Sequence, residues 1–312
     1  MKAFVTGAAG FIGSTLTERL LNDGAEVIGI DSFTDYYSRA IKEQNLVAAR
    51  AHPRFRFVEA RVQDADLARL LSGRTHVFHL AAQAGVRKSW GRDFTVYTEN
   101  NIEATQVLLE ACVKASLERF VYASSSSVYG DHVPMPMRED ALPQPVSPYG
   151  VSKLAAEQLC YLYFINYGVP TVSLRYFTVY GPRQRPDMGF HKFLRAAIRQ
   201  EAITVYGDGE QTRDFTFVAD AVSATVAAAT RGIAGRVYNI GGGSRVSINE
   251  VLDLIGRVSG HRPLVTSDSA QKGDMRHTYA ETWLARTDLG FHPTVDLEAG
   301  LAAEYKWIVD IL

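Results

Sequence analysis

A tyrosine and a lysine four residues apart, Tyr149 and Lys153, are the side chains of this chain best suited to catalysis. On one α-helix this spacing puts both on the same face. A lysine ammonium beside a phenol favours the phenolate and lowers its pKa toward the working pH, so that the tyrosine can act as a general acid or base. The same spacing is common on solvated helix faces without any chemical role, so the pair needs support from elsewhere in the sequence.

Four consecutive serines, Ser124–Ser127, give that support, because they directly follow the apolar run Phe120–Ala123. The run predicts a buried strand. A hydroxyl at the carboxyl end of a parallel strand lies where open α/β sheets bind their ligands. We therefore expect these hydroxyls at the same site as the tyrosine.

The opening of the chain predicts a phosphate-binding loop. An apolar run leads into Gly7, Gly10 and Gly13, and an amphipathic stretch follows over Ser14–Asn22. This pattern is typical of a buried strand and a tight turn into a helix, where free N–H groups and the helix dipole suit a dinucleotide pyrophosphate.

A second apolar run strengthens this interpretation, because Val27–Asp31 ends in an acid about twenty residues after the glycines. Asp31 is thereby placed to accept hydrogen bonds from the adenosine ribose and to repel a 2′-phosphate. The cofactor is therefore expected to be NAD and not NADP. A nicotinamide site with an activated tyrosine predicts hydride transfer at a carbinol carbon.

The alternation of strands and helices predicts an α/β fold, a Rossmann-type doubly wound parallel sheet with helices on both faces. Further strands are expected at Phe55–Val58, Val77–Leu80, Phe120–Ala123 and Thr171–Arg175, and helices at Ala65–Leu71, Thr98–Ala115 and Tyr149–Tyr167. The last two helices carry apolar residues around more of their circumference than one sheet face can cover, so we expect a homodimer formed through them.

From Thr178 onward the regular alternation of strands and helices ends. Prolines and glycines crowd Gly181–Gly189, a helical pattern covers Phe190–Gln200, and short strands and loops follow. We expect a Rossmann domain over residues 1–177, with a return segment near 214–240, and a smaller C-terminal α/β substrate lobe over most of residues 178–312.

Composition excludes several classes of protein. The 312 residues are 46% hydrophobic and 21% charged, with a net charge of −1 and no basic block, which argues against nucleic-acid binding. Cys112 and Cys160 are interpreted as buried structural thiols, and no metal-ligand spacing occurs. The sequence shows no secretory signal and no apolar run long enough to cross a bilayer, so we expect a cytoplasmic protein with no metal and no membrane partner.

Five motifs in order resemble the extended short-chain dehydrogenase/reductases that act on nucleotide sugars. They are Thr6–Gly13, His79–Ala82, Ser124–Gly130, Tyr149–Lys153 and, in the lobe, Tyr206–Gly209 with Gln211–Phe215. The resemblance covers essentially the whole chain and implies catalysis by Tyr149, Lys153 and Ser125. It implies NAD contacts at Gly7, Ala9, Gly10, Phe11, Ile12, Gly13, Asp31, Ser32, Val62, Leu80, Ala81, Ala82, Tyr149, Lys153 and Tyr176.

Three segments resemble the UDP-glucuronate 4-epimerases in particular, namely Asp31–Tyr37, Ala81–Arg87 and Arg175–Met188. UDP-galactose 4-epimerases usually carry asparagine at the position of Thr178 and lack the basic segment around Arg185. UDP-glucuronate decarboxylases and hexose dehydratases usually carry glutamate where this chain has Ser127. These differences favour an epimerase that acts on a uronate.

The resemblance implies conversion of UDP-glucuronate to UDP-galacturonate through a transient 4-keto sugar. Tyr149 would be the acid and base, Ser125 would bind the reacting oxygen, and Lys153 would keep the phenol acidic. A 4-keto uronate loses carbon dioxide readily, so surrounding hydroxyls, with Arg185 as counter-charge, are expected to hold its carboxylate out of line with the carbonyl π orbitals. Substrate contacts are expected at Arg87, Ser125, Ser126, Ser127, Tyr149, Thr178, Arg185, Tyr206, Gln211, Arg213 and Arg276.

One position departs from the family pattern. Relatives commonly have an acid after the third strand that reaches the adenine amino group, and Arg61 stands there in this chain. Arginine cannot accept that hydrogen bond but can stack on the adenine face. The alternatives left open are a 4-epimerase for UDP-glucose or UDP-N-acetylglucosamine, a UDP-glucuronate decarboxylase, and a non-catalytic NAD-sensing protein, although relatives of the last kind typically lose the tyrosine and lysine.

Overall fold

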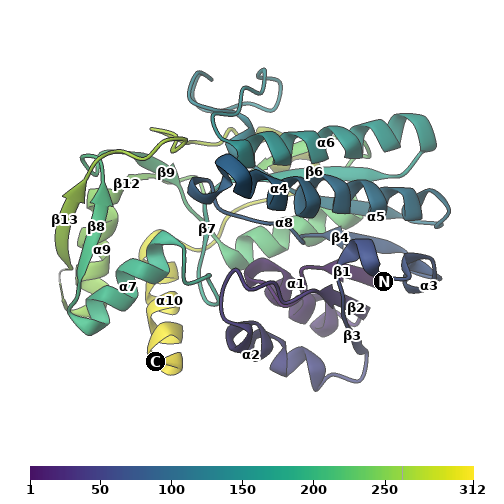
Figure 1. Cartoon of the computed structure of the whole chain (residues 1–312), viewed down its shortest axis with the longest axis horizontal. Coiled ribbons are helices and arrows are strands. Elements are labelled where there is room, and N and C mark those ends of the chain that lie inside the picture. Colours follow the sequence, from purple (N-terminus) through teal and green to yellow (C-terminus); the bar gives the residue numbers. More distant parts are fainter. Residues whose placement is uncertain (262) are drawn as a thin grey trace.

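The computed structural model describes residues 1–261 and 263–312 and is built on a seven-stranded parallel sheet (Figure 1). In spatial order its strands are β11 (Val237–Ile240), β6 (Thr171–Tyr176), β5 (Arg119–Ser125), β4 (His76–His79), β1 (Lys2–Thr6), β2 (Glu26–Asp31) and β3 (Phe55–Glu59). The chain runs outward from β1 to β3 and then resumes at β4 on the other side of β1. Open α/β sheets bind ligands at such a reversal, beyond the carboxyl ends of the strands.

Helices cover both faces of the sheet because its strands are apolar on both sides. In β1, Ala3 and Val5 belong to one hydrophobic core and Phe4 to another, since successive side chains point to opposite faces. The first core is covered by α1 (Phe11–Asn22), α2 (Arg39–Arg50) and α8 (Val218–Arg231), and the second by α3 (Leu67–Leu71), α5 (Ala104–Val113) and α6 (Pro148–Tyr167). The short helix α4 (Phe94–Tyr97) lies against α6.

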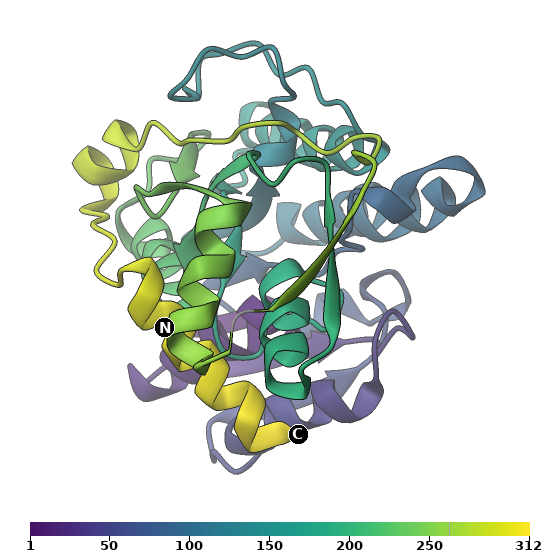
Figure 2. The same cartoon turned by 90° about the vertical axis from the view of Figure 1, so that its left-hand side faces the viewer.

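A smaller lobe stands beside the sheet and faces the viewer in Figure 2. Its helices are α7 (Gly189–Arg199), α9 (Ile248–Ser259) and α10 (Leu297–Ile311). Its strands form three pairs, β7 (Val179–Tyr180) with β10 (Thr216–Phe217), β9 (Thr212–Asp214) with β12 (Arg245–Ser247), and β8 (Ala202–Tyr206) with β13 (Leu264–Asp268). A separate core of residues such as Phe190, Leu194, Phe215 and Ile255 holds these elements together.

The predicted doubly wound fold and its strands are confirmed, and the differences lie in the helices. Residues Thr98–Glu103 form wider, π-type turns before α5, which ends at Val113, so the predicted helix over Thr98–Ala115 is not uniform. Sequence reasoning missed α2, a mostly polar helix. Among the described residues, no helix is long and apolar enough to cross a membrane.

Candidate active site

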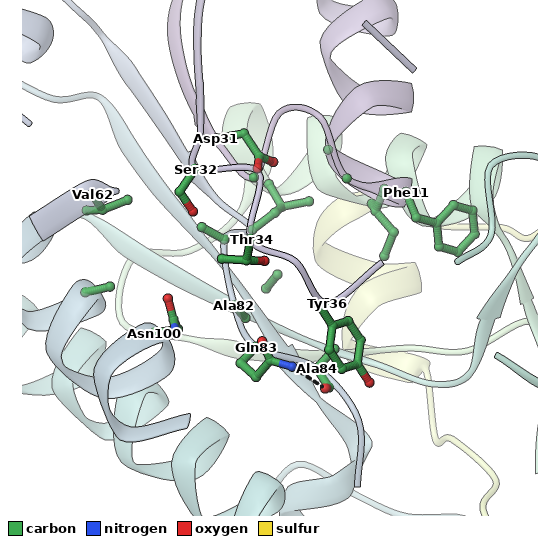
Figure 3. A pocket seen from close by; sticks show the side chains of 18 of the residues that line it. Phe11, Asp31, Ser32, Thr34, Tyr36, Val62, Ala82, Gln83, Ala84 and Asn100 are labelled. Carbon is green, nitrogen blue, oxygen red and sulfur yellow. Dashed lines mark hydrogen bonds between the residues drawn. The ribbon is translucent and has the colours of Figure 1, made fainter. Parts of the chain in front are cut away.

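A pocket runs along the carboxyl ends of β1, β2, β4 and β5 (Figure 3). Of the predicted cofactor contacts, those that line it are Gly7, Gly10, Phe11, Ile12, Gly13, Asp31, Ser32, Val62, Leu80, Ala81, Ala82, Tyr149, Lys153 and Tyr176. The lining residues that sequence reasoning did not name include Thr34, Tyr36, Tyr37, Lys42, Gln63, Gln83 and Asn100. Most of these come from loops after β2 and β4. The segment around Tyr36 had carried the family resemblance, which was the one signal available for it.

The glycine loop after β1 is packed too tightly for any side chain at two of its positions. Gly7 has a φ of +69° and leaves no room for a Cβ, which would lie 2.8 Å from Ala81 N. A Cβ on Gly13 would lie 2.1 Å from Gly7 O. This close approach brings the start of α1 to the pocket, where the first N–H groups of a helix lack acceptors within it and suit a phosphate.

Asp31 is fixed by the backbone at the end of β2. Its Oδ1 accepts from Phe33 N at 2.9 Å and its Oδ2 from Ala9 N at 3.2 Å. Ala9 is fully buried and does not line the pocket, so it acts by holding Asp31. Lys42 Nζ lies 3.4 Å from Oδ1, and both side chains are buried. The carboxylate keeps lone pairs for ribose hydroxyls, so this end of the pocket fits the adenosine of NAD.

The departure at Arg61 lies at the edge of the same pocket. Arg61 lines it, and its guanidinium forms an exposed ion pair with Glu99 at 3.3 Å. Gln63 Nε2 donates to the backbone oxygen of Glu99 at 2.8 Å. Arg61 is therefore near enough to meet a base, and its stacking on adenine stays a prediction.

Tyr149 and Lys153 both line this pocket. Helix α6 begins at Pro148 after the cap Ser147, whose side chain accepts from Gly150 N at 3.1 Å, so Tyr149 lies in the first turn. Lys153 Nζ donates to the backbone oxygen of Ala123 and lies 4.4 Å from the centre of the Tyr122 ring.

Burial pushes both side chains toward their neutral forms. It raises the pKa of Tyr149, which the Ser125 hydroxyl and then the Arg185 charge lower. It lowers the pKa of Lys153 to about 7. Perturbed groups that share a cleft are typical of catalytic sites. The effect of Arg185 on the pKa of Tyr149 was not predicted, because the sequence analysis assigned the lowering of this pKa to Lys153 alone.

Two residues that the sequence did not flag hold the first turn of α6 in place. Asn101, in the π-type turns, donates from Nδ2 to Ser152 Oγ at 2.8 Å, and Ser152 Oγ donates to Tyr149 O at 2.7 Å. Asn101 Oδ1 accepts from Gln83 N at 2.7 Å. These bonds join the loop after β4 to the helix that carries the tyrosine. No spacing in the sequence signals them, because they depend on the widened turns.

The four serines do not share one position. Of these, Ser124 lines the pocket, while Ser125 and Ser126 are buried and Ser127 is half-buried. Ser125 Oγ accepts from Ser127 N at 3.1 Å, and this bond turns the chain at the end of β5. Ser125 is the serine that influences Tyr149.

Arg185 lines the pocket but already has a partner. Its Nε and Nη2 donate to the two oxygens of Asp187, both at 3.0 Å. Tyr36 OH donates to the same carboxylate at 3.2 Å. Arg185 is therefore held in place with its charge largely balanced. Thr178, the other predicted contact in this segment, is half-buried, and its backbone oxygen accepts from Thr216 N.

The remaining predicted substrate contacts gather where the loop after β4 meets the lobe, outside the lining of this pocket. Arg87 pairs with Asp274 at 2.7 Å and lies 4.1 Å from the centre of the Tyr206 ring. Gln211 Nε2 donates to Tyr206 O at 2.9 Å. These contacts place the aromatic ring, the arginine and the amide in one group, suited to a nucleotide.

Two further arginines flank that group. Arg276 forms a bidentate pair with Asp208, both bonds at 2.7 Å. Arg213 donates to the backbone oxygens of Thr212 and Arg276. Within residues 1–261 and 263–312, Arg213 has no ion pair with a carboxylate.

Comparison with known proteins agrees with this geometry. Residues 3–241 match the model of the NAD dependent epimerase/dehydratase family. The chain is 44% identical over 310 residues to the uncharacterized UDP-glucose epimerase YtcB of Bacillus subtilis, with 99% of this chain and 98% of that protein covered. It is 34% identical over 308 residues to the UDP-glucuronate 4-epimerase of Thermodesulfobacterium geofontis, with 97% and 94% covered. The crystal structure of UDP-glucuronic acid 4-epimerase from Bacillus cereus, in complex with UDP-glucuronic acid and NAD, superposes with a TM-score of 0.97 at 44% identity and 100% coverage of both chains.

Proposed function

Because the chain belongs to the NAD-dependent epimerase/dehydratase family, we propose that it is an isomerase that uses NAD to invert C4 of a UDP-sugar. The proposed substrate is UDP-glucuronate and the product UDP-galacturonate, with a 4-keto sugar between them. The observation that carries the proposal is that Tyr149 and Lys153 line the same pocket as the glycine loop and Asp31. The names and ligands of the relatives support the choice of sugar.

The residues around Tyr149 perform the proton transfers in this scheme. When bound, NAD would supply the acceptor for the C4 hydride and the means to return it to the opposite face of the ring. Tyr149 takes the proton of the 4-hydroxyl during oxidation and gives it back during reduction, and Ser125 binds the reacting oxygen. Lys153 supplies positive charge one helical turn away, which favours the phenolate.

The uronate carboxylate is proposed to lie near Arg185 and Thr178. Arg185 donates from Nε and Nη2 to Asp187, so its Nη1 is left to donate to a second carboxylate. The hydroxyls of Thr178, Ser126 and Ser127 would complete the contacts. Such a grip keeps the C5–carboxylate bond away from the alignment in which the 4-keto sugar loses carbon dioxide.

A neutral-sugar 4-epimerase is the second candidate, and one observation favours it. Asp187 balances the charge of Arg185, so the pocket offers a uronate less net positive charge than the sequence implied. The relative YtcB, named as a UDP-glucose epimerase, is also 44% identical. A decarboxylase is disfavoured by Ser127 where those enzymes carry glutamate, and an NAD-sensing protein by the retained tyrosine and lysine.

Incubation of the purified protein with UDP-glucuronate and, separately, with UDP-glucose tests the proposal. Proton NMR should detect the C4-inverted uronate, and the Tyr149→Phe variant serves as the inactive control. Conversion of UDP-glucose alone would favour the second candidate, and release of carbon dioxide would identify a decarboxylase. Bound NAD with neither sugar converted would point to an NAD-sensing protein.

We also propose a homodimer formed through α5 and α6. The outer side of α6 exposes Tyr161, Leu162, Ile165 and Tyr167, with between 46% and 57% of each residue accessible. A row of this kind is unusual on a monomer and suits a second copy of the same helix pair. Light scattering should give twice the mass of 34.4 kDa, and Ile165→Glu should shift it toward the monomer. A wild-type monomer at micromolar concentration would refute the dimer.

The domain division stays a proposal, with a Rossmann domain over residues 1–177, a return segment near 214–240 and a substrate lobe over most of 178–312. It is supported by β11, which pairs with β6 in the main sheet, and by the separate core of the lobe. The cytoplasmic location also stays a prediction.

A further inference from the structure

The carboxylate of Glu157 ties α6 to the strand that ends in the proposed catalytic hydroxyl. Glu157 lies one helical turn after Lys153, and both are buried. Its Oε2 accepts from Ser124 Oγ at 2.6 Å. The two carboxylate oxygens also accept from Arg175, Oε1 from Nη2 at 2.6 Å and Oε2 from Nε at 3.0 Å. Ser124 and Arg175 are register partners on β5 and β6, so one carboxylate holds two neighbouring strands against the helix.

Ser124 stands between the two residues that contact the reacting pair. The backbone oxygen of Ala123 accepts the hydrogen bond of Lys153 Nζ, and Ser125 provides the hydroxyl beside Tyr149. Consecutive residues of a strand point to opposite faces but share one backbone. A bond that fixes Ser124 therefore also fixes the positions of Ala123 and Ser125.

Glu157 also carries a negative charge on the same helix as Lys153, one turn further on. The titratable or charged groups around Lys153 are Tyr149, Glu157 and Cys160 on α6, Tyr122 on β5, His79 on β4 and Arg175 on β6. Burial raises the pKa of Tyr122 and Cys160 and lowers that of His79 to about 3, so these three are neutral at pH 7. Among these groups, the charge that acts on Lys153 is that of Glu157, which favours the ammonium form. Arg175 is paired with Glu157 and is not among the groups that shift the pKa of Lys153.

We propose that Glu157 is a positioning residue for the epimerisation, which holds β5 so that Ala123 and Ser125 meet α6 and which places a negative charge one helical turn from Lys153. The inference rests on the proposed function, because it takes Tyr149 and Lys153 as the reacting pair. A merely structural ion pair would stabilise the fold without any effect on the charge of Lys153.

Two variants separate the positional effect from the effect of charge. Ser124→Ala removes the bond to β5 and keeps the ion pair of Glu157 with Arg175. We expect kcat to fall about three- to tenfold, as for one lost hydrogen bond, with the alkaline limb of the kcat–pH profile unchanged.

The second variant combines Glu157→Gln with Arg175→Met, so that no unpaired ion is left in the core. Loss of the anion lets Lys153 release its proton more readily, so we expect the alkaline limb to move to lower pH by about one unit. Titration of the Lys153 Cε signal by NMR, in holoenzyme labelled with ¹³C-lysine, should show the same shift without any need for turnover.

Glu304→Gln is the matched control, because Glu304 is also a buried carboxylate but accepts from Gly181 N in the lobe. It should leave the titration of Lys153 unchanged, and circular dichroism checks that each variant folds. A folded double variant in which Lys153 titrates as in the wild type would overturn the role of charge, and wild-type kcat in Ser124→Ala would overturn the positional role. Failure of the proposed function looks different, since the wild type would then convert neither sugar while the titration still decides the charge on Lys153.

Discussion

The cofactor-binding part and the substrate-binding part of the proposed site are formed by different kinds of groups. The cofactor part is made of backbone, with a loop so tight that a Cβ on Gly13 would lie 2.1 Å from Gly7 O. The substrate part is made of long charged side chains, in which Arg87, Arg185 and Arg276 each hold an aspartate. A backbone site is formed before its ligand arrives. An arginine that already holds an aspartate must share or exchange that partner, so specificity can change there without any change in fold.

Arg213 is the exception within the substrate part. It donates only to backbone oxygens in the portion of the chain described, and burial lowers its pKa, which the charges of Asp274 and Asp131 raise only in part. Arg213 is half-buried, and a guanidinium taken partly out of water without a close carboxylate has much to gain from an anionic ligand. Arg213 is therefore the side chain best prepared for the diphosphate.

The largest effect is expected where the cofactor part meets the chemistry. Tyr149→Phe removes the acid and base and leaves the glycine loop intact, so kcat should fall by a factor on the order of 10² to 10⁴. Stopped assays with UDP-glucuronate measure this loss, and release of NAD on denaturation should show unchanged cofactor content. Near wild-type turnover in the folded variant would contradict the proposed mechanism.

One methyl group should be enough to damage the backbone-built part. Gly13→Ala forces its Cβ against Gly7 O, and overpacking of this kind costs about 1–3 kcal/mol of folding stability. The loop must shift to relieve the clash, so the N–H groups at the start of α1 are displaced and NAD binding should weaken. Gly10→Ala is the matched control, because its Cβ would lie at 3.2 Å from the same oxygen. NAD content after purification and NAD titration of the apoprotein compare the two. Equal binding by both variants would show that the loop is less rigid than its contacts indicate.

The same contrast explains what the sequence could and could not predict. The glycine loop, Asp31 and the Tyr149–Lys153 pair follow from local spacing and strand periodicity. The partner of Arg87 could not be found in this way, because Asp274 is 187 residues away in the sequence. The fold of the lobe brings the two side chains together. Asn101 was missed because its role depends on π-type turns inside an otherwise ordinary helical pattern. Asp187 stood two residues from Arg185 in the sequence, and no rule indicated which of its neighbours it would bind.

Arg213→Ala should cause the largest loss in the side-chain part. A hydrogen bond to a charged group contributes about 1.5–3 kcal/mol, so KM should rise about ten- to a hundredfold. The rise should be equal for UDP-glucuronate and UDP-glucose, because the diphosphate is common to both. Steady-state kinetics on the two substrates measure it. A loss confined to one sugar would place Arg213 at the sugar and not at the diphosphate.

Arg185→Ala should discriminate between the same two substrates. Because Asp187 already balances part of the charge, we expect about a tenfold loss of kcat/KM on UDP-glucuronate and little change on UDP-glucose. A loosened carboxylate should also let some 4-keto sugar lose carbon dioxide, which leaves NADH that absorbs at 340 nm. Thr178→Ala should do the same to a smaller extent. Equal losses on both sugars with no carbon dioxide would mean that the carboxylate is held elsewhere, with Arg87 and the Ser125–Ser127 hydroxyls as the next places to test.

The smallest effect is a gain, and it tests whether the substrate must compete with the aspartates. Asp274→Asn keeps the shape of the side chain but releases the charge of Arg87, which stays stacked on Tyr206. The pair is partly exposed, with 45% and 28% of its side chains accessible, and such pairs contribute about 0.2–1 kcal/mol. KM for either UDP-sugar should therefore fall by a factor of up to about five, most clearly at low salt because exposed charges are screened. Asp140→Asn is the matched control, since it breaks an exposed pair with Arg138 and lines no part of the pocket. If Asp274→Asn raised KM instead, Asp274 would be holding Arg87 in the orientation that the nucleotide needs, and the paired arginines would be as preformed as the glycine loop.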